Sequence, residues 1–127
     1  MPLVEINIAK GKEKDYLLQL MDETMNCIQQ SLQLPKDDRN IRLSEYDADL
    51  FQMKPPYTVL IKIDMFSGRT VETKKKLYKL LVDNLNKKLK MDPKEVFILI
   101  SEQPRENWGV RGGIAASDIQ LDFKVEV

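Results

Sequence analysis

The feature of this sequence that most constrains its fold is an internal repeat. Sliding the chain by 57 residues, with no gap, lays Leu3-Val4-Glu5-Ile6 on Leu60-Ile61-Lys62-Ile63 and Gly11 on Gly68. The same shift lays Leu20 on Leu77, Leu32 on Leu89 and residues 41–45 on residues 98–102. A fixed period of this kind indicates that one supersecondary unit occurs twice. We predict a single domain of 127 residues, with repeat one at 2–45, a linker at 46–57, repeat two at 58–102 and a C-terminal loop and strand at 103–127.

Each half has the order strand, glycine turn, long helix, short turn, strand, which is typical of a βαβ unit with parallel strands. Apolar residues recur at helical spacing at Leu17, Met21, Met25, Ile28 and Leu32, and again at Leu77, Leu81, Leu85 and Leu89. Asp92-Pro93-Lys94-Glu95 predicts a short capped turn before the last strand of the repeat, and Pro55-Pro56 marks the linker. The predicted fold class is α+β: two tandem βαβ repeats form a four-stranded sheet with two helices on one face.

Alternation along the predicted strands separates two faces of the sheet. The face expected under the helices carries Val4, Ile6, Ile8, Ile41, Leu43, Ile61, Ile63, Met65, Ile98 and Ile100. The opposite face mixes Glu5, Asn7, Arg42, Lys62 and Asp64 with Leu3, Leu60, Phe97 and Leu99. A mixed face suits a subunit interface, although the pattern fits a half-apolar face left in water almost as well.

Composition excludes several classes of function. Histidine is absent, which removes the usual general base and imidazole metal ligand, and the lone Cys27 can form neither an intrachain disulfide nor a thiolate cluster. The 20 basic residues are matched by 20 acidic ones, which argues against a nucleic-acid partner, and the lysines of 74–76 are expected on a solvated helix face. No apolar stretch of the sequence is long enough to span a membrane, so we expect a soluble, cytoplasmic protein with no membrane partner. We also expect no bound metal and no cofactor.

The chain beyond the repeat has a different character. Residues 103–113 form a glycine-rich loop that holds the only tryptophan, Trp108, and whose spacing fits no phosphate-binding pattern. Residues 121–127 alternate apolar and charged side chains, which predicts a half-buried edge strand available for pairing with another subunit.

The N-terminus offers an unusual base. A small second residue normally permits removal of the initiator methionine, and the mature chain would then begin with the secondary amine of Pro2. Burial or a nearby arginine lowers the pKa of such an amine from about 7.7–8.0, so that its neutral form can accept a proton at working pH. The structural alternative is that Pro2 merely begins an edge strand, where its missing N–H does no harm.

Several stretches, in order and spacing, resemble a known family: Pro2-Leu3, residues 34–39, residues 68–75 and Asn107-Trp108. The chain is similar to the tautomerase superfamily, 4-oxalocrotonate tautomerase-like, and within it to the longer chains related to malonate semialdehyde decarboxylase. The resemblance implies a MIF-like fold, a homotrimer and Pro2 as the catalytic amine. It also implies that Asp38 matches a catalytic aspartate and Arg69 a substrate-binding arginine. The family's second arginine is missing, because Ser67 stands at its position, and Arg111 or Arg39 would have to replace it.

The favoured function is keto-enol tautomerisation of an enol or 2-oxo acid, with Pro2 as base, Arg69 on the substrate carboxylate and Trp108 as a wall of the pocket. If Asp38 is functional, it would orient or activate water beside protonated Pro2, which gives decarboxylation or hydration of a 3-oxo acid such as malonate semialdehyde. The ordinary readings are a solvated helix start for Arg69, a core aromatic for Trp108 and a polar turn for Asp38. An alternative from another class is a non-catalytic ferredoxin-like module that binds a small molecule.

Overall fold

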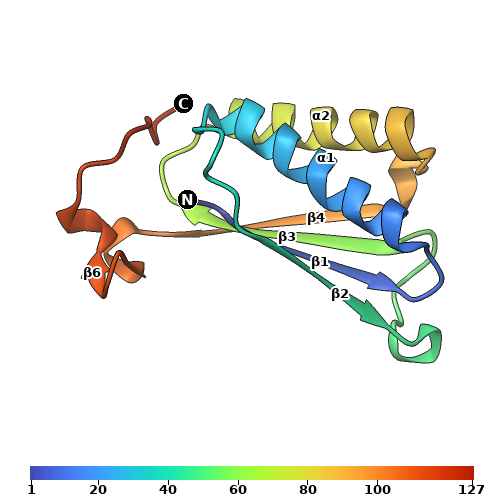
Figure 1. The fold of residues 1–127 in the computed structure, drawn as a ribbon. Helices are drawn as coiled ribbons and strands as arrows, with labels where there is room; N and C mark the ends of the chain where they lie inside the picture. The colour runs from blue at the N-terminus through green and yellow to red at the C-terminus, as the bar shows by residue number, and fades with distance from the viewer.

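The protein is described by a computed structural model that covers residues 1–127 (Figure 1). The first repeat contains β1 (Leu3–Ala9), α1 (Lys14–Leu32) and β2 (Ile41–Tyr46). The second contains β3 (Val59–Phe66), α2 (Val71–Leu89) and β4 (Val96–Gln103). Both helices have 19 residues, and α2 begins and ends 57 positions after α1. The repeated βαβ order predicted from the sequence is present in the structure.

One mixed sheet joins the two repeats in the order β2-β1-β3-β4. The strands of each repeat pair in parallel, and the repeats meet where β1 pairs antiparallel with β3. Both helices lie on the same face of this sheet (Figure 1), so the predicted fold class is confirmed. The ferredoxin-like alternative is wrong, because that fold splits its βαβ unit whereas β1 here pairs directly with β2.

The core fills the space between the sheet and the helices. It contains 18 buried residues, and the predicted inward positions of the two central strands are all within it. Ile41, Leu43, Ile98 and Ile100 pack against the core but stay partly buried, since they lie on the edge strands. Cys27 is fully buried, and this burial raises the pKa of its thiol, which disfavours the reactive thiolate.

Glycine marks the same turn in both repeats. Gly11 and Gly68 follow β1 and β3 with φ of 133° and 132°, a conformation that side chains rarely adopt. The helices also end alike, because Gln33 and Lys90 both adopt the left-handed conformation as C-caps. The predicted capped turn is confirmed: Asp92 accepts from the Lys94 amide, while Glu95 accepts from the Asp92 amide.

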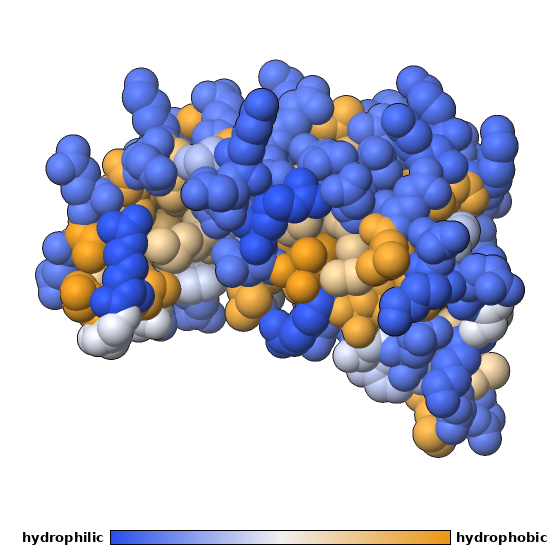
Figure 2. All heavy atoms as spheres, viewed as in Figure 1, coloured by the Kyte–Doolittle hydropathy of each residue, from blue (hydrophilic) through white to orange (hydrophobic).

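The sheet face opposite the helices is half apolar, as the alternation predicts. Phe97 and Leu99 are 39% and 45% exposed on it, and Lys62 of β3 is the charged neighbour that pairs with Leu99. Glu5 and Arg42 form an ion pair on the other half of this face. Figure 2 shows hydrophilic side chains over most of the helical layer, whereas hydrophobic ones gather below it, along the sheet and near the C-terminal segment. None of the helices has the length and apolar composition needed to cross a membrane.

The C-terminal segment corrects one prediction. Residues 121–127 form no strand, although their side chains alternate between partly buried and exposed positions. They lie over the start of α2, where the Val127 carbonyl accepts from the Thr70 amide and Val125 is buried against Phe66. Alternation correctly indicated one-sided burial, but within one chain the segment pairs with no strand. The only strands after β4 are the two-residue β5 (Gly109–Val110) and β6 (Ile114–Ala115), which pair with each other.

Candidate active site

The amino terminus and Asp38 meet at one end of the sheet. The amino group of Met1 lies 2.9 Å from Oδ2 of Asp38, and both side chains are largely buried. Asp38 is carried by the loop between α1 and β2, whose carbonyls at Pro35, Lys36 and Asp38 accept from the side chain of Gln29. Pro2 is buried directly behind Met1. Loss of Met1 would move the amine by one residue, about 3.8 Å along the chain, into this buried place.

The surroundings act on the amine in opposite directions. Burial is the largest influence on the pKa of the Met1 amino group and lowers it, and the charge of Arg69 lowers it further. The hydrogen bond and charge of Asp38, with the charge of Asp122, raise it, yet the net pKa is below its ordinary value. An amine placed here is therefore shifted toward its neutral, proton-accepting form.

Arg69 is buried near this amine with two of its three side-chain nitrogens unpartnered. The chain leaves β3, turns at Gly68 and places Arg69 just before α2, where its side chain is only 6% exposed. Nη1 donates to the Phe66 carbonyl at 3.4 Å, whereas Nε and Nη2 are buried with no hydrogen-bond partner. Glu102, which faces the same region, is paired with Lys74. A buried guanidinium with free donors is costly unless an anion satisfies it, so this position favours an anionic ligand.

A cavity of about 190 Å³ opens beside the amine. Its lining is Met1, Pro35, Asp37, Asp38, Arg111, Asp122 and Phe123. Arg111 thus brings a second guanidinium from the glycine-rich loop. Arg69 does not line this cavity, but its guanidinium carbon lies 5.9 Å from the ring centroid of Phe123, which does. The carboxylates here do not form a group of the kind that holds a metal ion.

Aromatic rings form the apolar side of the site. Phe66, at the end of β3, is fully buried, and Trp108 packs edge-on against it with a centroid distance of 5.1 Å. The ring of Phe123 is nearly parallel to that of Phe66, with a centroid distance of 6.4 Å. Trp108 does not line the cavity itself; it belongs to the small apolar cluster that also includes Met1 and Val125.

Arg39 is not brought to this cavity. Its guanidinium turns back onto α1, where it pairs with Asp22 at 2.8 Å and donates to Asn26 and Gln29. These contacts anchor the loop that carries Asp38. Of the two arginines considered as replacements for the second family arginine, Arg111 lines the cavity and Arg39 does not.

Some residues of the site could not be identified from the sequence. The rings of Phe66 and Phe123 stack on each other, but neither residue is part of a recognisable motif. Only the alternation of residues 121–127 indicated that Phe123 would be partly buried. Arg105 donates to the carbonyls of Ala116 and Ile119 and thereby holds the C-terminal loop in place. No motif or spacing distinguishes Arg105 from an ordinary surface arginine.

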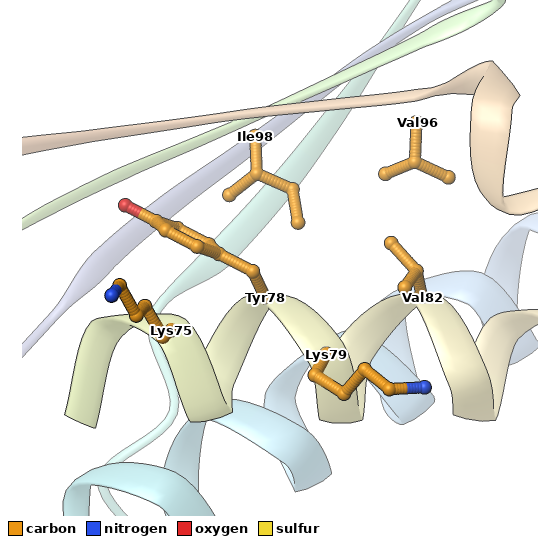
Figure 3. A pocket seen from close by; sticks show the side chains of 6 residues that line it. All are labelled: Lys75, Tyr78, Lys79, Val82, Val96 and Ile98. Atoms are coloured by element: carbon orange, nitrogen blue, oxygen red, sulfur yellow. The ribbon is translucent and has the colours of Figure 1, made fainter. Parts of the chain in front are cut away.

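Two larger grooves lie along the outer edges of the sheet. One of about 440 Å³ runs between α2 and β4, where Tyr78 and Val82 face Ile98 and Val96 (Figure 3). Its counterpart of about 440 Å³ runs between α1 and β2. Both are mainly apolar and lack the combination of amine, carboxylate and buried guanidinium found at the amino terminus.

Residues 38–111, more than half of the chain, match the family of tautomerase enzymes. The chain belongs to this tautomerase family. The probable tautomerase YusQ of Bacillus subtilis is 26% identical over 123 residues, which cover 91% of this chain and 97% of YusQ. The superfamily predicted from the sequence is thereby confirmed, and the relatives support a tautomerase-type enzyme.

Solved structures agree with this membership of the tautomerase family. A malonate semialdehyde decarboxylase is 20% identical and superposes with a TM-score of 0.83, over 93% of this chain and 99% of that chain. A fused 4-OT, described as a symmetric trimer, is 26% identical with a TM-score of 0.81, over 91% of this chain and 96% of that chain. The decarboxylase, at this identity, shows that the fold is shared.

Proposed function

We propose that this tautomerase interconverts the enol and keto forms of a 2-oxo acid, with Pro2 as the proton carrier once Met1 is removed. The observation that supports it most is the buried Arg69, whose Nε and Nη2 lack partners close to the amino terminus. An arginine in this state is suited to a carboxylate, which accepts paired, charge-assisted hydrogen bonds. Burial and the charge of Arg69 favour the neutral amine that the reaction needs.

The reaction moves one proton and leaves the atoms of the substrate otherwise unchanged. Neutral Pro2 accepts the proton of the enol hydroxyl, and the resulting protonated amine delivers it to the neighbouring carbon to give the ketone. Arg69 holds the carboxylate and stabilises the negative charge that develops as the oxygen loses its proton. This contact requires that the ring of Phe123, whose centroid lies 5.9 Å from the Arg69 guanidinium carbon, moves aside. Phe66 and Trp108 would keep water from the apolar side of the site.

Arg111 supplies the second cation in this proposal. The family position for a second arginine holds Ser67, which is exposed. Arg111 reaches the cavity from a different element, the loop after β5, and is exposed at its rim. It would hold the far end of the substrate acid.

A second candidate reaction rests on Asp38. Its carboxylate lies 2.9 Å from the terminal amino group, and its hydrogen bond raises the pKa of that group against the effect of burial. A protonated Pro2 beside Asp38 would polarise a carbonyl while Asp38 positions water, as hydration or decarboxylation of a 3-oxo acid requires. The net lowering of the amine pKa makes this the weaker of the two candidates.

We further propose that the protein acts as a homotrimer. The fused 4-OT relative is a trimer, and two features of this chain agree with such an assembly. The open sheet face carries exposed Phe97 and Leu99, and apolar grooves run beside both edge strands. Burial of such surfaces against other subunits would be favourable.

The test is ketonisation of phenylenolpyruvate, followed by ultraviolet absorbance, after mass spectrometry has established that Met1 is absent. Pro2→Ala should lower kcat/KM by about 100-fold or more, since it replaces the secondary amine that serves as base. Arg69→Ala should lower it by about 100-fold through loss of charge stabilisation. Lys87→Ala, which removes an exposed cation on α2, should leave the rate unchanged.

Three other outcomes would contradict parts of this proposal. Activity that survives in Pro2→Ala would reject Pro2 as the base. Turnover of malonate semialdehyde without ketonisation would favour the second candidate. Retention of Met1 together with no activity on either substrate would reject both reactions.

A further inference from the structure

A second cavity, of about 380 Å³, lies at the opposite end of the sheet from the amino terminus. It is formed where β1 turns into α1, where β3 begins and where α2 ends, elements that Figure 1 shows together at the end away from both termini. Its lining is Ile8, Ala9, Lys10, Gly11, Lys12, Tyr16, Thr58, Leu89, Lys90, Met91 and Glu95. This cavity is larger than the one beside Met1.

The repeat makes this cavity the counterpart of the candidate active site. The shift of 57 residues that relates the halves lays Met1 on Thr58, Pro2 on Val59, Asp38 on Glu95 and Lys12 on Arg69. The key contact is also repeated. Thr58 Oγ1 lies 3.0 Å from a carboxylate oxygen of Glu95, as the Met1 amine lies 2.9 Å from Asp38.

The two places differ in the group that matters for proton transfer. Val59, in the position of Pro2, is a buried residue inside the chain, and its peptide nitrogen is not basic. The second cavity therefore keeps a cation and a carboxylate at the matching positions but has no amine that could become a base. It can bind a substrate-like molecule without converting it by the Pro2 mechanism.

The charges around the second cavity leave positive groups free. Lys10 pairs with Asp47 at 2.9 Å, and both of these side chains are exposed. Glu95 is occupied, since it accepts from the Thr58 hydroxyl and from the Asp92 amide. Neither Lys12 nor Lys90 takes part in an ion pair. A carboxylate brought to this rim would meet two unpaired ammonium groups.

The walls of the cavity suit the rest of an organic acid. Ile8, Leu89 and Met91 supply apolar surface to its lining. Tyr16 stands at the side, with the ammonium of Lys12 4.9 Å from its ring centroid. Burial, with the charge of Glu95, raises the pKa of Tyr16, so its hydroxyl stays protonated at neutral pH.

We propose that this cavity is a second, non-catalytic binding site for a small 2-oxo carboxylic acid with an apolar body, held through its carboxylate by Lys12 and Lys90. The choice of a 2-oxo acid rests on the proposed function, because the cavity repeats the layout of the candidate active site. Each chain would then bind two molecules of the same class, one at each end of the sheet, and turn over only the one beside Pro2.

The test uses benzoylformate, a 2-oxo acid that has no hydrogen on its α-carbon and so cannot tautomerise. Amide chemical shifts of the full chain, labelled with ¹⁵N, are followed by NMR during titration. We expect saturable shifts at Gly11, Lys12 and Tyr16. The Kd for benzoylformate, measured from these three amides, should rise at least tenfold in the double variant Lys12→Gln/Lys90→Gln. It should not change in the control variant Lys87→Gln. The methyl ester of benzoylformate, which lacks the charge, should leave these amides unshifted.

The same titration separates this proposal from the proposed function. Arg69→Ala should abolish shifts near Asp38 and Arg111 and leave those at Gly11 and Lys12 in place. Shifts at Gly11 that do not saturate, or that persist in the double lysine variant, would overturn the second site. Loss of the Asp38 shifts alone would bear only on the active site. Because Lys12 and Lys90 are exposed, the double variant is expected to keep the fold, and its unshifted core amides check this.

Discussion

At the scale of single residues, the terminal amine is balanced between burial and one carboxylate. Asp38 raises the pKa of the amino group in this place, while burial and Arg69 lower it. Removing the carboxylate in Asp38→Asn should therefore lower the pKa of the Pro2 amine further, because the nearby negative charge that favours the protonated amine is lost. The acid limb of the pH profile of kcat/KM for ketonisation should move to lower pH in parallel.

Asp37 provides the matched control for this prediction. It lines the same cavity but makes no contact with the amino group, so Asp37→Asn should shift the acid limb much less. Decarboxylation or hydration, which need the protonated amine, should instead weaken in Asp38→Asn. Equal shifts in the two variants would mean that Asp38 acts only through the general charge of the cavity.

Residues of the site could be predicted from the sequence to different degrees. Pro2, Asp38 and Arg69 were indicated by resemblance, and the structure brings Asp38 and Arg69 to the amino terminus. Arg39 and Trp108 lie outside the cavity for a physical reason: neighbouring partners on α1 and at Phe66 take up their side chains. The fold brings these partners close to Arg39 and Trp108, so the spacing of residues along the sequence does not predict the contacts.

At the scale of elements, the repeat offers a matched pair of turns. Gly11 and Gly68 have nearly the same positive φ, but a Cβ at Gly11 would meet nothing, whereas one at Gly68 would meet Val125 Cγ1 at 2.9 Å. Gly11→Ala should thus cost only backbone strain, about 1–3 kcal/mol. Gly68→Ala should cost about 1–3 kcal/mol more, because it also pushes the C-terminal segment away. Denaturant unfolding of both variants measures the difference.

Val125→Ala supplies the control, since it removes the methyl group that the new Cβ would strike. In the double variant with Gly68→Ala, the loss of stability should be smaller than the sum of the single losses. Additive losses would show that the segment does not press on Gly68. The same change combined with Gly11→Ala should be additive.

Elements inside the repeat could be predicted well, and those outside it could not. Helices α1 and α2 have apolar positions at regular spacing and glycine at their approaches, so local pattern and burial agree. The segment 121–127 also alternates, but its backbone bonds to Thr70 and its side chains pack on Phe66 and Gly68. The periodicity of apolar residues indicates which side of a segment is buried, but it does not indicate which other segment covers that side.

At the scale of the whole molecule, the open sheet face is the feature that a single chain leaves unexplained. Its apolar members include Phe97 and Leu99, which point away from the helices on the edge strand β4. If this face is buried between subunits, a charge placed there is left without water or a partner. Leu99→Asp should therefore dissociate the proposed trimer, and the mass from sedimentation velocity should fall from about three times the 14.8 kDa of the protomer toward that value.

Leu50→Asp distinguishes an interface from mere exposure. Leu50 is 70% exposed, more than Leu99, but lies in the linker between the repeats and belongs to none of the sheet's strands. Its replacement should leave the mass unchanged if the sheet face is what joins the subunits.

A trimer that survives Leu99→Asp would instead place the interface at the apolar grooves beside β2 and β4, where Tyr78→Asp on α2 is the corresponding change. The ketonisation rate per chain then tells whether each active site is complete within one chain: a dissociated Leu99→Asp variant should be less active than the unchanged protein only if a neighbouring subunit contributes to the site.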